Sequence, residues 1–135
     1  MTVSKIKAYF IPAGYQGYFS DIENSLEAKQ KYVGGLIQVV SLDDVDIIIN
    51  DEGKLMGLPV NRAIVDDDEN VLDVIVGDII CLRHDDDEGE FRSILENDLQ
   101  TITKYLRPCK IIGVRDGYTI VALLPEKDLK KWKDE

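Results

Sequence analysis

The chain has 135 residues, 44% of them hydrophobic, and its 16 basic and 26 acidic residues give a formal net charge of −10. This length and composition fit one domain over residues 1–135 that buries its own core, and they exclude a largely disordered chain. Such acidity repels nucleic-acid phosphates, and without a transmembrane-length apolar stretch or a signal-peptide core we expect a cytoplasmic protein that binds neither membrane nor nucleic acid directly.

The N-terminal part predicts a strand followed by a helix. Lys5–Ile11 has the composition of a strand, and the aromatic, glycine-bearing residues 15–19 fit either a second strand or a loop. Asn24 and Glu27 have the spacing of a capping box, in which each side chain bonds the backbone N–H of the other. A helix over about residues 25–33 is therefore expected to begin there, and the two glycines after it suit its end.

The next segments predict a hairpin and a long β pattern. Leu36–Leu42 and Val45–Ile49 are rich in β-branched residues, and Asp43-Asp44 between them is a tight connection. Leu72–Arg83 is the longest β pattern in the chain. Gly77-Asp78 divides it, at either a bulge or a tight turn.

The C-terminal third predicts the second main helix and a hairpin. Ser93 and Glu96 have capping-box spacing ahead of a helix over about residues 94–106, which is expected to end before Pro108. Asp116-Gly117, between two apolar runs, is a strong turn signal and predicts a C-terminal β-hairpin, followed by a charged tail. These elements indicate an α+β fold with a mostly antiparallel sheet, two main helices and the C-terminal hairpin. The apolar stripe of the second helix consists of Leu95, Leu99, Ile102 and Leu106.

A polar segment from Asn50 to Arg62 stands between two apolar runs. Gly53 and Gly57 allow positive φ or a close approach of the backbone, and Pro59 stiffens its turn. Its two asparagines can each donate and accept hydrogen bonds. Two interpretations remain open for this segment: a structured loop whose amides hold its own backbone, or a loop that binds a ligand.

No enzyme signature occurs in the sequence. The Walker loop, the dinucleotide glycine fingerprint, the zinc-protease helix motif and the Gly-x-Ser-x-Gly elbow are all missing. The one histidine, His84, stands beside an acidic run and is expected to be an exposed loop residue rather than a base. Cys81 and Cys109 match no metal or redox spacing and are expected to be small buried hydrophobic residues. We therefore expect a non-enzymatic protein without a metal or cofactor.

The remaining candidates are basic and amide side chains that suit a phosphorylated small ligand. Arginine offers a planar fork for phosphate or carboxylate groups, and several cations in one concavity would bind such a ligand. For each basic residue the alternative is a surface ion pair with one of the abundant acids. The candidate ligand-binding residues are Asn50, Lys54, Asn61, Arg62 and Arg83.

Four short segments of the chain form a recognisable pattern. They are Val33-Gly34-Gly35 with Ile37, Asn50-x-Glu52-Gly53-Lys54-x-x-Gly57-Leu58-Pro59-x-Asn61-Arg62, Val76-Gly77-Asp78, and Glu88-Gly89-Glu90-Phe91-Arg92-Ser93-Ile94. This pattern resembles a phage and mobile-element domain family of unknown function. The resemblance covers about residues 5–106, so the C-terminal hairpin and charged tail, residues 108–135, lie outside it.

An acidic glycine turn after an isoleucine-rich strand, with a helix near the end, is more distantly similar to the anti-Thoeris phage proteins. Those proteins sequester cyclic ADP-ribose-type immune signals as oligomers, and related members take up cyclic oligonucleotides. The resemblance implies an anti-defence homo-oligomer of the host bacterial cytoplasm that binds a cyclic nucleotide signal of Thoeris or CBASS defence without chemistry. Aromatic side chains such as Tyr15, Tyr18 and Phe91 would stack on its base.

Two other interpretations remain open. Acidic clusters over residues 43–46, 66–69 and 85–90 suit a DNA-mimicking antirestriction inhibitor that acts by protein–protein binding. A small hydrolase of the signal is the third interpretation, and it needs a general base that the sequence does not offer.

Overall fold

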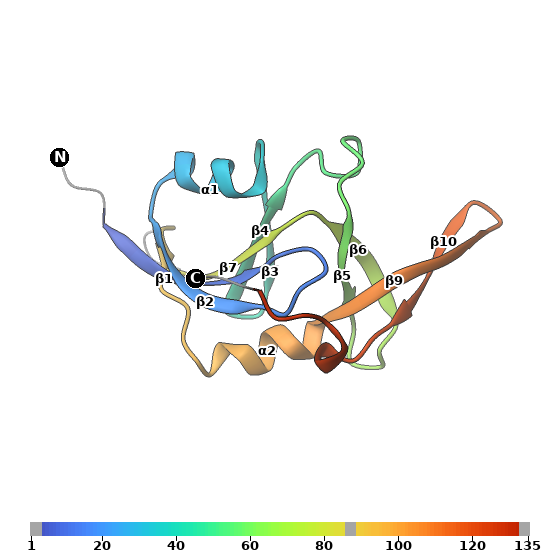
Figure 1. Ribbon diagram of the computed structural model, residues 1–135. Helices are drawn as coiled ribbons and strands as arrows, with labels where there is room; N and C mark the ends of the chain where they lie inside the picture. The colour runs from blue at the N-terminus through green and yellow to red at the C-terminus, as the bar shows by residue number, and fades with distance from the viewer. Residues whose placement is uncertain (1–3, 86–88, 133–135) are drawn as a thin grey trace.

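The computed structural model describes residues 4–85 and 89–132, which form two antiparallel sheets and two α-helices (Figure 1). One face of the larger, six-stranded sheet packs against helix α1 (Leu26–Val33). Its other face packs against helix α2 (Asp98–Tyr105) and the smaller, four-stranded sheet. In this layering both faces of the larger sheet bury apolar side chains.

The larger sheet has the strand order β2-β1-β7-β4-β3, and β8 pairs with β7. Its strands are β1 (Lys5–Ile11), β2 (Tyr18–Glu23), β3 (Ile37–Leu42), β4 (Val45–Asn50), β7 (Ile79–His84) and β8 (Phe91–Arg92). The smaller sheet has the order β10-β9-β5-β6. Its strands are β5 (Val60–Val65), β6 (Val71–Val76), β9 (Leu106–Arg115) and β10 (Tyr118–Leu123), and a 3-10 turn, Glu126–Asp128, follows.

The central strand β4 contributes to two hydrophobic clusters because its side chains alternate between the faces of the sheet. Ile47 points toward α2 and packs in one cluster with Ile102. Ile48 points toward α1 and packs in the other with Val33. All four side chains are buried, and each such burial stabilises the fold by roughly 1.5–3 kcal/mol relative to exposure.

The chain crosses from the smaller to the larger sheet at Gly77. The predicted break at Gly77-Asp78 is confirmed, but β6 and β7 on its two sides belong to different sheets instead of forming one interrupted strand or a hairpin. Gly77 has φ of 81° and donates its N–H to the carbonyl of Pro59 at 2.7 Å. A positive φ at this crossing favours glycine.

Asn61 is the extra residue of a bulge in β5, where the register with β6 shifts between Val60 and Arg62. Its side chain is buried, and its Nδ2 donates to the carbonyl oxygens of Ile11 and Gly77, both at 2.8 Å. The amide therefore ties the end of β1 to the crossing between the sheets. Bulges re-aim a side chain in this way without ending the strand.

Helix α1 is confirmed, but its predicted capping box is wrong. Ser25, not Asn24, is the N-cap, and its Oγ accepts from the N–H of Ala28 at 3.1 Å. Asn24 instead accepts from the ammonium of the buried Lys29 at 3.0 Å. The helix ends at Gly34 with φ of 84°, as the glycine pair predicts.

Helix α2 is shorter than predicted, by about four residues at its N-terminal end and by one at its C-terminal end, where strand β9 begins. It begins at Asp98 and not at about residue 94, and the Ser93 Oγ accepts from the N–H of Lys7 in place of capping. Leu106 already pairs with Ile64, and Pro108 lies inside β9. In the described ranges, neither this helix nor any other is long and apolar enough to cross a membrane.

Both predicted hairpins are confirmed, β3 with β4 and β9 with β10. The Asp116-Gly117 turn has φ of 53° and 82° at its two residues, as the tight hairpin turn requires. The segment of residues 15–19 resolves into a loop and the start of β2. The fold is thus a sheet-dominated form of the expected α+β class. Residues 86–88, within the acidic cluster of residues 85–90, lie outside the described residues.

Asn61→Ala is expected to lower the free energy of unfolding by about 2–3 kcal/mol, because two buried carbonyl oxygens lose their donor. Urea denaturation followed by circular dichroism measures the change. The matched control is Asn70→Ala in the exposed turn after β5, expected to change stability by less than about 1 kcal/mol. Equal effects of the two variants would contradict the bridging role of Asn61.

Candidate functional site

Asn50 holds the loop that follows β4. Its Oδ1 accepts from the N–H of Glu52 at 2.7 Å, and its Nδ2 donates to the carbonyl of Val33 at 3.0 Å. The side chain is buried, so both ends of its amide are used in fixing the loop against the end of α1. At Asn50 the contacts are therefore those of a structured loop whose side-chain amide holds its own backbone, one of the two interpretations left open by the sequence.

Arg62 is buried at the junction of the two sheets and the C-terminal tail. Its Nη1 donates to Asn61 Oδ1 at 2.9 Å, and its Nη2 donates to the carbonyl of Tyr15 at 3.0 Å. The carboxylate of Glu126 lies 3.1 Å from Nη2. Burial lowers the pKa of the guanidinium, and the neighbouring Glu126 carboxylate opposes that shift.

Lys54 and Arg83 lie in ion pairs at separate places. Lys54 pairs with Asp73 at 2.9 Å on the surface, where both side chains are more than half exposed. Arg83 makes a two-pronged contact with the buried Asp98, at 2.8 and 2.9 Å, which fixes the start of α2. The five predicted residues thus do not line one common cavity: Asn61 and Arg62 adjoin each other, Asn50 and Lys54 line a small cavity, and Arg83 stands apart.

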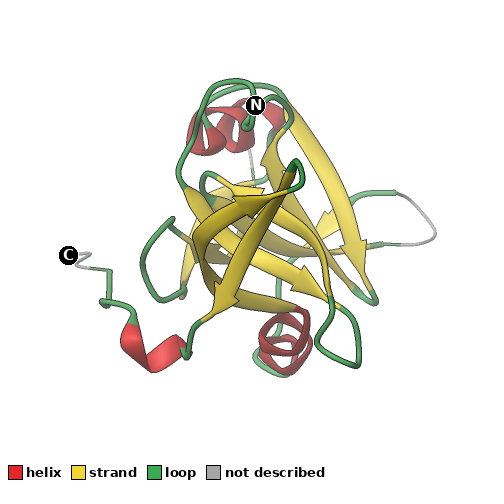
Figure 2. Cartoon of the chain, turned by 90° about the vertical axis from the view of Figure 1, so that its right-hand side faces the viewer, coloured by secondary structure: helices red, strands yellow, loops and turns green. Residues whose placement is uncertain are grey.

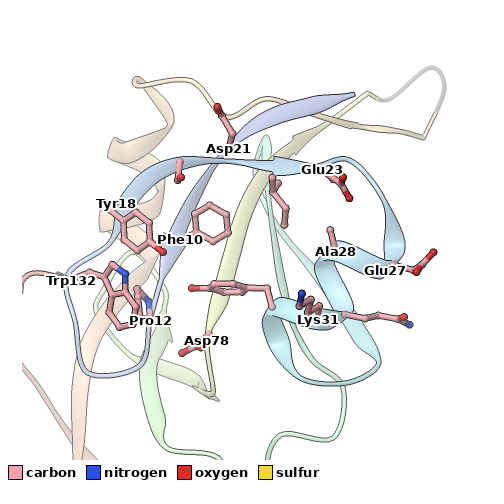
Figure 3. A pocket seen from close by; sticks show the side chains of 14 residues that line it. Phe10, Pro12, Tyr18, Asp21, Glu23, Glu27, Ala28, Lys31, Asp78 and Trp132 are labelled. Carbon is pink, nitrogen blue, oxygen red and sulfur yellow. The ribbon is translucent and has the colours of Figure 1, made fainter. Parts of the chain in front are cut away.

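An open groove of about 1110 Å³ lies between β2 and α1 (Figure 3). We call it the aromatic groove, because the rings of Phe10, Tyr18, Tyr32 and Trp132 line it. Phe10 comes from β1, Tyr18 from β2, Tyr32 from α1 and Trp132 from the tail. Three consecutive N-terminal elements therefore meet the distant C-terminal tail here.

The rings of the groove contact one another in a continuous series. Phe10 stacks on Tyr18 with centroids 5.5 Å apart and lies 4.8 Å from Tyr32. Trp132 is parallel to Tyr18 at 6.2 Å and meets Tyr15 edge-on at 5.0 Å. Such ring pairs add to the energy of burial and present flat faces to a ligand. Trp132 remains 42% exposed, so its ring is accessible.

Carboxylates outnumber cations around the aromatic groove. Asp21, Glu23, Glu27 and Asp78 line it together with a single cation, Lys31. The Oδ1 of Asp78 accepts from the N–H of Ala13 at 2.9 Å. Burial, followed by the charge of Asp78, raises the pKa of the Tyr32 phenol, which keeps this hydroxyl protonated as a donor.

Cys81, Cys109 and His84 are side chains that could act as a nucleophile or a general base. Cys81 and Cys109 are buried as predicted, and burial raises the pKa of both, which disfavours the reactive thiolate. The prediction of an exposed loop histidine is wrong. His84 ends β7, its side chain is 28% exposed, and its Nδ1 lies 3.0 Å from Oδ1 of the buried Asp46. Over the described ranges, no group of three metal-ligating side chains occurs.

The aromatic groove combines one predicted feature with one that sequence reasoning missed. Tyr15 and Tyr18 are among the predicted stacking residues, and the structure places both beside Trp132. The third, Phe91, lies under the ammonium of Lys29, 4.9 Å from its ring centroid. Trp132 offered only one signal, a lone tryptophan in a charged tail. The return of that tail to the groove depends on contacts such as Gln16 Nε2 donating to the Leu129 carbonyl at 2.8 Å.

Comparison with known proteins identifies one relationship. Residues 6–107 match the model of a family described as a domain of unknown function (DUF3846). Neither a curated protein nor a solved structure matches the chain. The matched segment ends at the second residue of β9. Most of the β9–β10 hairpin and the tail with Glu126 and Trp132 therefore lie outside it.

Arg62→Ala is expected to lower the free energy of unfolding by about 2–4 kcal/mol, because it leaves a cavity and unpaired groups at the sheet junction. Chemical denaturation measures the loss. The matched control is Lys54→Ala, which removes an exposed ion pair worth at most about 1 kcal/mol. An Arg62→Ala protein as stable as the control would show that the buried contacts contribute little.

The stability of the fold is expected to fall between about pH 10 and pH 12. Burial, and secondly the charge of Glu126, raises the pKa of Tyr9 from 10.0 to about 12. Because the folded state holds this proton more tightly, the stabilisation is complete below pH 10 and is lost as the pH rises through the folded value.

An alkaline titration of Tyr9→Phe, followed by circular dichroism, tests this cause. The variant is expected to unfold at a higher pH than the parent, whereas Tyr118→Phe, in an exposed position, should unfold at the same pH as the parent. An unchanged alkaline midpoint in Tyr9→Phe would exclude Tyr9 as the responsible group.

Proposed function

The chain belongs to the DUF3846 family, and from this premise we propose that it is a phage or mobile-element anti-defence protein that sequesters a nucleotide-derived immune signal without chemistry. The proposed ligand is of the cyclic ADP-ribose or cyclic oligonucleotide type. The observation that carries the proposal is the aromatic groove, which is open, lined by four rings and flanked by groups that hydrogen-bond. The distant similarity to anti-Thoeris proteins belongs to this proposal.

Stacking is the first support for the proposal. A nucleobase has two flat faces, and stacking on an aromatic side chain contributes roughly 1–3 kcal/mol per base. Trp132 and Tyr18 are parallel, and the Trp132 ring is partly exposed at the mouth of the groove. In the proposed complex the base lies against Trp132.

The polar groups of the groove suit the rest of a nucleoside. Carboxylates accept hydrogen bonds from ribose hydroxyls and from base amino groups, and Asp21 and Asp78 stand on the lining of the groove. Lys130 and Lys131 line a neighbouring hollow with Tyr15 and Trp132, where cations can reach phosphates. Because carboxylates predominate, the groove favours the base and the ribose hydroxyls of a ligand over its phosphates.

The residues predicted as ligand readers have a different role in this proposal. Arg62 and Asn61 bond each other and the backbone, and Arg83 holds Asp98. Asn61 and Arg62 support the groove indirectly, because Arg62 fixes both Tyr15 and the turn at Glu126 that precedes Trp132. The proposed site therefore lies between β2, α1 and the tail, and not in the loop after β4.

One observation favours the alternative, an acidic inhibitor that imitates DNA. Asp43, Asp66 and Asp67 line a single concavity beside Tyr105, so acids from two separate turns share one surface. Lys104 pairs with Asp67, and Arg107 pairs with Glu69 of the same turn. These pairs neutralise part of the surface, and for that reason the aromatic groove remains the main proposal.

The deciding experiment is thermal unfolding of the purified protein against a panel of cyclic ADP-ribose isomers and cyclic di- and trinucleotides. A ligand that binds only the folded state at a hundredfold excess over Kd stabilises it by about 2.7 kcal/mol. The bound compound is then recovered after denaturation and identified by mass spectrometry. Recovery of the intact compound supports sequestration, a converted product indicates a hydrolase, and no stabilisation by any compound rejects the proposal.

Trp132→Ala is expected to weaken binding of the stabilising compound about tenfold, since it removes one stacking surface worth roughly 1.4 kcal/mol. Isothermal titration calorimetry measures the affinity. The matched control is Tyr118→Ala, another exposed aromatic residue, which contributes nothing to the groove and should bind like the parent. Parent-like affinity in Trp132→Ala would remove the groove as the binding site.

A further inference from the structure

The β9–β10 hairpin projects from the body of the molecule (Figures 1 and 2). Surface apolar patches larger than roughly 300–600 Å² mark interaction sites in soluble proteins. Five large side chains on this one hairpin are more than one-third exposed. They are Ile111 at 51%, Ile112 at 59%, Val114 at 71%, Tyr118 at 76% and Ile120 at 38%.

The smaller sheet is apolar on both of its faces. One face, which includes Ile64 and Leu106, packs into the main core against the larger sheet. On the other face Ala63 and Cys109 form a separate cluster with half-buried side chains that include Val121 and Leu123. An antiparallel sheet with one solvated face ordinarily places polar residues there. This second apolar face continues along the hairpin to Ile111, which pairs with Val121.

Strand β10 is the outermost strand of the smaller sheet, and no described strand pairs with its free edge. Its residues, Tyr-Thr-Ile-Val-Ala-Leu, include neither a charge nor a proline. Proteins commonly protect a free edge with lysine, proline or a covering segment. Because β10 carries no charged side chain, two copies of it can pair antiparallel in any register without placing like charges opposite each other.

The distribution of charge also favours the β9–β10 hairpin as the place where two copies of the chain meet. With a net charge of −10, two copies repel each other over most of their surfaces. The segment from Leu106 to Leu123 differs, since it holds three basic residues and one acid. The basic residues are Arg107, Lys110 and Arg115, and the acid is Asp116. The two hairpins can therefore meet without bringing the acidic surfaces of the two copies together.

We propose that the protein forms a symmetric dimer in which β10 pairs antiparallel with β10 of a second copy. The contact is isologous, because the same strand serves on both sides of the two-fold axis. Joining the two edges makes one eight-stranded sheet across the dimer, and the exposed side chains of β10, Tyr118 and Ile120, pack across the axis. The residues of the aromatic groove belong to neither β9 nor β10, so both grooves stay open in the dimer.

Sedimentation velocity of the full chain over a range of micromolar concentrations tests the dimer. The parent is expected to sediment as a dimer. Tyr118→Lys combined with Ile120→Lys places two charges on the β10 strand of each copy, at the axis, and is expected to raise the dimer dissociation constant at least a hundredfold. The control pair, Leu36→Lys with Leu55→Lys, changes two leucines that are 59% and 87% exposed outside the hairpin and should remain dimeric.

Each outcome decides the proposal. A monomeric parent, or a hairpin variant that stays dimeric, overturns it, and so does a control pair that dissociates equally. Because all four side chains are partly exposed, circular dichroism should show every variant folded. If the hairpin variant is unfolded, Tyr118→Lys alone, at a position 76% exposed, replaces it under the same criteria.

Discussion

The arrangement of this molecule depends on one buried cation. A guanidinium removed from water is costly unless its donors and its charge are matched. Arg62 finds its acceptors in Asn61, in the Tyr15 carbonyl and in Glu126. These belong to a strand bulge, to the loop between β1 and β2, and to the tail, so a single side chain fixes three segments that no regular strand pairing joins. The 3-10 turn of the tail and the aromatic groove are positioned through that same contact.

Much of the fold is predictable because local chemistry and tertiary structure agree. Lys5–Ile11 is a strand with the predicted bounds, Asp116-Gly117 makes the predicted turn, and the glycine after Val33 ends α1. Where local pattern and pairing compete, pairing prevails. Leu106 continues the apolar period of a helix, yet it pairs with Ile64 in a strand, because that pairing buries it fully.

The candidate site was harder to predict, for a reason visible in the central motif. A polar residue in a sequence gives no sign of whether its partner is a ligand or the protein's own backbone. Asn50 and Asn61 are of a residue type that often binds ligands. In this fold, however, their side-chain amides donate hydrogen bonds to carbonyl oxygens of the same chain. The aromatic groove escapes local reasoning because Phe10, Tyr32 and Trp132 share no periodicity and meet only in the folded chain. Trp132 and Glu126 also lie outside the family segment, so this chain supplies part of the groove from its own extension.

The pairing of Arg62 with Glu126 has a consequence for biosynthesis. The two residues are separated by 64 positions, and the carboxylate is made long after the β3–β4 hairpin can form. During translation the N-terminal part folds first, and contacts of large sequence separation close late. In a nascent chain that has not reached residue 126, Arg62 has no carboxylate partner. Burying its guanidinium then costs more free energy than in the finished fold, where Glu126 compensates part of the desolvation. Completion of the core is in this way coupled to completion of the tail that also carries the tryptophan of the groove.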